Sequence, residues 1–219
     1  LVVRLSDLPL NDADVDLEDP DELLAALHVI GVSDASLGSL SIYGGEFAVL
    51  ELPAGTTGDV SFHYTLADEL DGTGLGLVRG TVDALHADTI TGGARRDLLI
   101  GSPLAETLLG LNGIDDLYGR GGDDVLEGGD DADRLDGGDG IDTARYAGSN
   151  IGIRGDLLAR IGQGGHAQGD QWFSIESMEG SPFADQLFGD LGPNGLTGAG
   201  GLELLDGGDG ADTLAGGDG

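Results

Sequence analysis

Aspartate recurs at the sixth position of a nine-residue unit that starts with glycine. The leading glycines form two runs: Gly92, Gly101, Gly110, Gly119, Gly128 and Gly137, then Gly180, Gly189, Gly198, Gly207 and Gly216. Asp fills the sixth position in seven of the ten complete units: Asp97, Asp115, Asp124, Asp133, Asp142, Asp185 and Asp212. Carboxylates and the carbonyls of glycine-rich turns are hard oxygen donors, and Ca²⁺ takes roughly 6–8 such ligands in flexible geometry. This spacing therefore predicts a row of calcium sites.

The same unit predicts the element that positions these carboxylates. Position eight is Leu in nine of the ten complete units, and Ala144 is the exception. A glycine-rich front half suits a tight turn, and a back half with one large inward residue suits a short strand. No unit can bury its leucine alone, so the units must stack. We therefore expect an all-β fold in which residues 87–145 and 180–219 form a parallel β-roll in two runs, the second truncated.

The repeated pattern G-G-x-G-x-D-x-L-x resembles the RTX (repeats-in-toxin) family of calcium-binding nonapeptide repeats. The resemblance implies that several Ca²⁺ ions lie between turns n and n+2. The first turn gives the carbonyls of positions two and four and its Asp, and the second gives positions one and three and its own Asp. The implied ligands of the best site are Arg120, Gly122 and Asp124 with Gly137, Asp139 and Asp142. Those of a second are Leu111, Gly113 and Asp115 with Gly128, Asp130 and Asp133. Those of a weaker third are Gly93, Arg95 and Asp97 with Gly110, Asn112 and Asp115. In the second run they are Asp190, Gly192 and Asn194 with Gly207, Asp209 and Asp212.

Some units depart from the pattern. Asn194 and Glu203 stand where Asp is expected, and the unit of Gly216 lacks its sixth residue. Arg95 replaces a turn glycine, and Glu106 replaces the Asp of the second unit. Degenerate terminal coils are what capping of a stack requires. We therefore expect the weakest metal binding at these units, and a single Asp in any turn could be no more than a solvated turn residue.

Composition limits the classes of function. The chain of 219 residues carries 41 acidic residues against 9 Arg and no Lys, for a net charge of −32. Such a surface repels nucleic acid and anionic membranes and attracts cations. Self-repulsion should keep the repeats disordered without calcium, and the 43 glycines agree with that. The leucine in almost every unit argues against disorder once calcium is present.

Signs of enzymatic chemistry are absent from the sequence. There is no cysteine and no H-E-x-x-H or G-x-S-x-G motif, and the four histidines are scattered. We therefore expect no enzyme here, no nucleic-acid partner and no membrane insertion. The oligomeric state is left open.

Residues 1–86 have a different texture, with short apolar runs between turn residues. The runs are LVVRL, LHVIGV, SLSIYG, EFAVLEL, VSFHYTL and GLVRGTVDAL, which favours a β-sandwich. The segments NDADVD (Asn11–Asp16) and PAGTTGDVSFHYTLAD (Pro53–Asp68) resemble bacterial cadherin-like and Ig-like domains. That resemblance implies a calcium site at Asp12, Asp14 and Asp16, with Asp68 or Asp71. A solvated acidic loop explains the same residues equally well. We also expect one or two helical turns from Asp19 to Leu27.

Residues 146–179 interrupt the repeat and shift its register. Two strand-like runs, NIGIRGDLLA and QWFSIESME, flank the loop Gly162–Asp170. We expect wider coils that continue the roll and bury Trp172 or Phe173. Asp170 and Glu176 could bind a further cation, although a surface or hydrogen-bonding role is favoured.

The RTX resemblance implies a role outside the cell. It implies export by a type I secretion apparatus of a Gram-negative bacterium, a secreted or cell-surface location, and folding on contact with calcium. Both ends of the chain look cut, so we expect a fragment of a larger protein. One hypothesis is a structural or adhesive segment of a surface protein. The other is the non-catalytic module of a secreted protease, lipase or alginate epimerase. The sequence of the rest of the parent protein would discriminate between them.

Overall fold

The computed structural model describes residues 2–4, 28–33, 39–43, 47–51, 58–67, 73–82 and 89–218. The chain divides into two compact units, Leu1–His86 and Ala87–Gly219. Each unit is described by itself.

The first unit contains two antiparallel sheets of three strands. The six predicted strands are confirmed as β1 (Val2–Arg4), β2 (His28–Ser33), β3 (Ser39–Tyr43), β4 (Phe47–Glu51), β5 (Gly58–Ala67) and β6 (Thr73–Val82). The sheet orders are β1-β4-β3 and β2-β5-β6. A sandwich built from these two sheets stays a prediction. The expected helical turns and the acidic residues Asp12, Asp14, Asp16, Asp68 and Asp71 lie outside the described residues.

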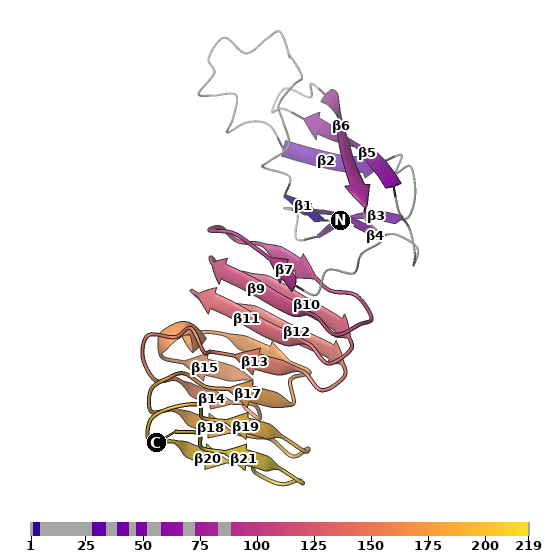
Figure 1. Cartoon of the computed structure of the whole chain (residues 1–219). Coiled ribbons are helices and arrows are strands. Elements are labelled where there is room, and N and C mark those ends of the chain that lie inside the picture. The colour runs from indigo at the N-terminus through magenta and orange to yellow at the C-terminus, as the bar shows by residue number, and fades with distance from the viewer. Residues whose placement is uncertain are drawn as a thin grey trace. The chain divides into compact units, whose positions relative to one another are not determined.

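The second unit is a parallel β-solenoid of about seven turns, so the predicted roll is confirmed (Figure 1). One sheet runs β21-β19-β17-β13-β11-β9-β7 and the other β20-β18-β14-β15-β16-β12-β10-β8. The strands of the first sheet are β7 (Thr89–Thr91), β9 (Thr107–Asn112), β11 (Val125–Asp130), β13 (Thr143–Arg145), β17 (Ser177–Glu179), β19 (Gly195–Thr197) and β21 (Thr213–Ala215). Those of the second are β8 (Leu98–Ile100), β10 (Asp116–Gly121), β12 (Arg134–Asp139), β14 (Arg154–Asp156), β15 (Ile161–Gln163), β16 (Gln171–Phe173), β18 (Gln186–Phe188) and β20 (Leu204–Asp206).

The leucines of position eight form the core between the two sheets. Strands of successive coils pair in parallel with a shift of two nonapeptides, so Leu99, Leu117 and Leu135 stack in register. Leu108 and Leu126 stack likewise in the other sheet. Burying each such side chain contributes roughly 2 kcal/mol. The core fades at the last coil, because Leu214 is 47% exposed.

The interruption widens one sheet and leaves the other unchanged. Strands β14 and β15 pair antiparallel and lie between β16 and β18, whereas β13, β17 and β19 are direct neighbours in the opposite sheet. A short 3-10 helix, η2 (Gly165–Ala167), follows β15. The expected burial of an aromatic is confirmed for Trp172, while Phe173 is half-buried. Gly155 and Gly162 make room for the indole, since a Cβ on either would lie 3.3 or 3.0 Å from it.

Candidate metal centre

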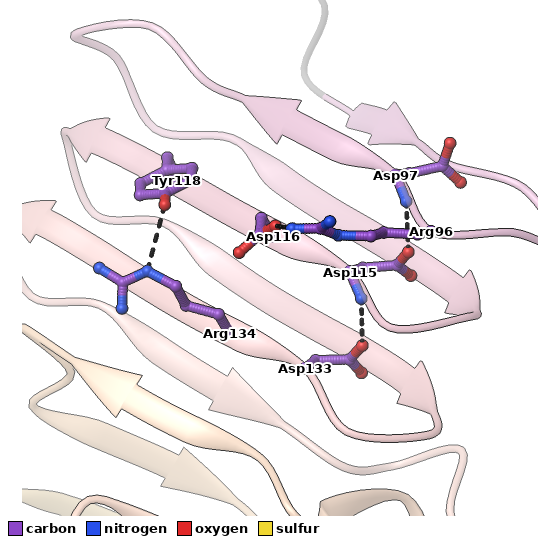
Figure 2. Close-up of polar contacts among 7 residues, drawn as sticks. All are labelled: Arg96, Asp97, Asp115, Asp116, Tyr118, Asp133 and Arg134. Atoms are coloured by element: carbon purple, nitrogen blue, oxygen red, sulfur yellow. Dashed lines mark hydrogen bonds and ion pairs between the residues drawn. The ribbon is translucent and has the colours of Figure 1, made fainter. Parts of the chain in front are cut away.

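The acidic residues of the turns on one side of the roll form a hydrogen-bonded ladder. Backbone N–H groups of Asp97, Asp115 and Asp133 each donate to the Oδ1 atom of the next acidic residue along, at 2.7, 2.8 and 2.9 Å (Figure 2 shows the first two). The acceptors are Asp115, Asp133 and Asp170. Stacking of the coils therefore brings these carboxylates into one row, each immediately before the first residue of β8, β10, β12 or β16.

A second ladder lies at the turns that precede the other sheet. The backbone N–H of Glu106 donates to Asp124 at 2.8 Å, and that of Asp124 donates to Asp142 at 2.8 Å. The N–H of Asp142 donates to Glu176 at 3.0 Å. Because each rung is two nonapeptides from the last within a run, alternate turns fall on opposite edges of the roll.

Two of these carboxylates have a buried oxygen without a donor. Asp133 and Asp142 are 2% and 0% exposed, and the Oδ2 atom of each has no hydrogen-bond partner. An ionised carboxylate oxygen in such surroundings is costly unless a cation or a donor compensates it. On each edge of the roll, a buried carboxylate oxygen together with the nearby backbone carbonyls fits a hard cation such as Ca²⁺.

Backbone carbonyls complete the surroundings of the predicted best site. The Arg120 carbonyl faces Gly138 in the next turn along the same edge of the roll, and the Gly122 carbonyl faces Gly140 in that turn. A Cβ on Gly119 would lie 2.6 Å from the Gly137 carbonyl and against the Asp124 carboxylate. Asp139 pairs with Gly121 in the strand ladder. The structure thus brings the six predicted residues Arg120, Gly122, Asp124, Gly137, Asp139 and Asp142 into two adjacent turns.

The other three predicted sets also lie in pairs of adjacent turns. In the second set, Leu111 pairs with Gly129 and Asn112 with Asp130. In the third, the N–H of Asn112 donates to the Gly93 carbonyl at 3.2 Å. The remaining members of these sets are Gly113, Asp115, Gly128 and Asp133, and Arg95, Asp97 and Gly110.

The fourth set, in the second run, differs in its side-chain chemistry. The N–H of Asp209 donates to the Asp190 carbonyl at 3.2 Å, and that of Asn194 to Asp212 Oδ1 at 2.9 Å. The Gly192 carbonyl faces Gly210, and the Gly207 carbonyl faces Gly189. The neutral Asn194 amide donates to the Glu176 carbonyl at 3.2 Å. At position six this set therefore has one carboxylate, Asp212, where its counterpart in the first run has two, Asp124 and Asp142.

The described part of the chain has no cluster of three or more His, Cys, Asp or Glu side chains that could hold a metal. A cation between two turns would therefore take most of its oxygens from backbone carbonyls, as the assignment from the sequence implies.

Burial raises the pKa of three ladder carboxylates in the chain without metal. Loss of solvent raises the pKa of Asp133 to about 8, and the charges of Asp170, Asp115 and Asp131 add to the effect. The pKa of Asp142 rises to about 6 for the same first reason. The pKa of Asp170 rises to about 7, again through burial. Without metal, these three carboxyl groups thus hold protons at a pH where isolated carboxylates do not.

The metal sets predicted from the sequence leave out several acidic residues that the structure places in these rows. Asp170 and Glu176 serve as the next rung in each ladder, which agrees with their favoured hydrogen-bonding role. Glu106 and Asp185 hold sixth positions in their units, and this was the signal that could have placed them. Glu203 accepts from the N–H of Asp185 at 2.8 Å and has a buried Oε1 without a partner.

A family model for the RTX calcium-binding nonapeptide repeat matches the chain in four places. The matches cover residues 85–103, 109–144, 179–214 and 197–219. The chain contains RTX calcium-binding nonapeptide repeats. A comparison with curated proteins finds no match.

The RTX matches coincide with the regular coils and leave residues 145–178 between them uncovered. That stretch contains the antiparallel hairpin β14–β15, which departs from the nonapeptide geometry. The matches begin at residue 85, so they do not extend to the strands of the first unit and leave its cadherin-like resemblance unsupported. Among the described residues, no helix has the length and apolar character needed to span a bilayer.

Proposed function

We propose that this chain is a calcium-binding RTX module whose roll folds as calcium binds. The observation that carries the proposal is the pair of buried oxygens, Asp133 Oδ2 and Asp142 Oδ2, that have no donor. Burial of such charges opposes folding unless a cation offsets it. When bound, Ca²⁺ would supply positive charge, and the carboxylates and carbonyls of two turns would supply the oxygens that hold it. Its binding free energy then becomes folding free energy.

The roles of the chain's own residues follow from the two ladders. Backbone N–H groups hold the Oδ1 atoms of Asp115, Asp124, Asp133 and Asp142, which orients each carboxylate. The carbonyls of positions two and four of one turn face the next turn along the same edge of the roll. The buried leucines fix the coil spacing, so the oxygens are brought together only when neighbouring coils stack.

This linkage suits a protein that is exported before it folds. A chain with a net charge of −32 repels itself without cations and stays extended where calcium is scarce. Outside the cell, where calcium is abundant, mass action drives the roll to fold. We place the protein outside a Gram-negative cell, exported by a type I apparatus, on the strength of its RTX repeats.

Within the parent protein, we propose a structural or adhesive role. The support is the order of the two units, an antiparallel β unit followed by a calcium roll, which suits an extended surface protein. Serial β units in the rest of the parent would support this role, and a catalytic motif there would instead make the roll an accessory module of a secreted enzyme.

The test is a calcium titration of the whole chain followed by circular dichroism, with calorimetry for the number of ions. We expect conversion from coil to β structure at millimolar Ca²⁺, reversed by a chelator. Asp133→Asn and Asp142→Asn should each raise the midpoint and lower the number of ions. Asp131→Asn is the matched control, because Asp131 is exposed in the same turn as Asp133. Equal compactness in calcium and in chelator would exclude the proposal.

A further inference from the structure

The nonapeptide turns of the roll occur in two conformations, which differ at position two. In seven turns this residue is left-handed, with φ of 82° at Leu111, 77° at Arg120, 110° at Gly129, 101° at Gly138, 69° at Ala199, 80° at Gly208 and 85° at Gly217. In the other four, the position-two residue lies outside the left-handed region: Gly93, Ser102, Ser181 and Asp190. We call the first kind open turns and the second kind closed turns.

In a closed turn, the turn's own backbone donates a hydrogen bond to the acidic or amide side chain at position six. The N–H of position two donates to the side-chain oxygen of position six, at 2.6 Å from Gly93 to Asp97 and 2.7 Å from Ser181 to Asp185. The same bond is 3.0 Å from Ser102 to Glu106 and 2.7 Å from Asp190 to Asn194. In addition, the hydroxyl groups of Ser102 and Ser181 donate to Glu106 and Asp185.

The open turns of Asp133 and Asp142 lack this internal donor. At Asp133 and Asp142, whose position-two residues Gly129 and Gly138 are left-handed, the Oδ2 atom is buried and has no partner. The conformation of one backbone residue therefore decides whether the carboxylate is satisfied by its own turn or left available to a cation.

The two conformations are not distributed at random along the roll. Turns on one edge of the roll follow one another at eighteen-residue steps within a run. On each edge of each run, the first described turn is closed and every later one is open. The rung that precedes Asp185 is Ile153, whose N–H donates to Asp185 Oδ1 and which has no carboxylate to offer a cation.

From this order we infer that each closed turn ends a column of calcium ions. Its backbone N–H takes the place that an ion holds at the carboxylate of an open turn, so no ion is bound on its upstream side. Ions lie only between a turn and an open turn downstream of it. The inference rests on the proposed calcium function and specifies which of its turns accept an ion from each side.

The same substitution in an open and a closed turn tests this assignment. Arg120→Thr favours the closed conformation, because a β-branched residue is strained in the left-handed region. Arg120 is exposed, so its side chain contributes little packing. Ser102→Thr keeps both the closed conformation and the hydroxyl group that donates to Glu106. The number of bound ions is measured by equilibrium dialysis with elemental analysis, and the calcium midpoint by circular dichroism.

We expect Arg120→Thr to lose at least one ion and to raise the calcium midpoint by more than about twofold, because a β-branched residue is a genuine outlier at positive φ, where Arg is only uncommon. Ser102→Thr should keep the ion count and shift the midpoint less than about twofold, since no strained angle is needed. Should Arg120→Thr fail to fold, Arg120→Gly still tests the inference. It should keep the count and lower the midpoint, because glycine adopts this angle without strain.

Two results overturn the inference while leaving the proposed function intact. One is an equal effect of Ser102→Thr and Arg120→Thr, and the other is an unchanged ion count and midpoint in both Arg120 variants. A wild-type chain that binds no ion at millimolar Ca²⁺ instead overturns the proposed function itself.

Discussion

The hydroxyl of Tyr146 donates a hydrogen bond of 2.7 Å to Oδ2 of Asp170, the oxygen that has no donor in Asp133. Both groups are buried, and Trp172 Nε1 in turn donates to the Tyr146 hydroxyl at 2.7 Å. Burial also raises the pKa of Tyr146, which keeps the hydroxyl protonated and able to donate. The interrupting segment thus ends the first ladder with a protein donor.

Removal of that hydroxyl should destabilise the roll even with calcium bound. Tyr146→Phe leaves one oxygen of Asp170 and the Trp172 N–H without partners in a buried position. We expect the free energy of unfolding to fall by about 1–3 kcal/mol. Urea unfolding in saturating calcium, followed by the fluorescence of the single tryptophan, measures it. Tyr118→Phe is the control, because Tyr118 is half-buried on the outer face and should cost less. Equal costs would show that the buried contact has no special weight.

Acidification should favour the folded form of the metal-free chain. The folded-state pKa values of Asp133 and Asp142, about 8 and about 6, lie above the ordinary value of 3.8. For an acid with a raised folded-state pKa, the folded form loses stability as the pH rises from the unfolded value to the folded value. In chelator, the β signal in circular dichroism should therefore grow as the pH falls from about 8 towards about 4. A signal that does not change over this range would contradict the expectation.

The calcium midpoint should show the opposite dependence on pH. Calcium requires the ionised carboxylates and displaces the protons that the metal-free ladders hold. The midpoint should fall as the pH rises from about 5 to about 8, where Asp133 ionises last. Calcium titrations at constant ionic strength and several pH values measure this dependence. Asp133→Asn should make the midpoint depend less on pH at the upper end of this range.

The hairpin β14–β15 depends on the absence of side chains at its inward positions. A Cβ on Gly155 would lie 2.6 Å from Met178 Sδ and 3.3 Å from the Trp172 ring. Gly155→Ala should therefore cost about 1–3 kcal/mol through overpacking, measured by urea unfolding in calcium. Gly216→Ala is the matched control, because its Cβ would meet nothing within 4 Å. A neutral Gly155→Ala would mean that Met178 and Trp172 can move aside.

The sequence predicts the regular coils of this roll but not the segment that interrupts them. Leucine at position eight and glycine in the turn recur at fixed spacing, so stacking and the inward face follow from local pattern. Strand β15 comes from the edge of a glycine-rich loop, and its antiparallel pairing depends on the distant Trp172 filling the space above Gly155 and Gly162. Such a contact has no periodic signal.

The sequence likewise does not predict which turns are open and which are closed. Intrinsic preference would place glycine in the left-handed region and Leu or Arg outside it. The structure shows the reverse at Gly93, Leu111 and Arg120. At these three turns the conformation follows the place of the turn in its column and departs from the preference of its second residue. The sequence identified the carboxylates of the candidate sites, but which of them carry an internal donor could be learned only from the stacked coils.

The central coils of the roll should carry more of its stability than the last one. Leu126 is fully buried between stacked neighbours, whereas Leu214 is 47% exposed in the last complete coil. Leu126→Ala should cost about 2–5 kcal/mol through lost burial and the cavity left behind. Because calcium binding supplies folding free energy, the same variant should also raise the calcium midpoint. Leu214→Ala should change stability by about 1 kcal/mol or less, since nearly half of its surface is already exposed. Urea unfolding and calcium titration of both variants measure these effects, and comparable losses at the two positions would contradict a core that fades toward the last coil.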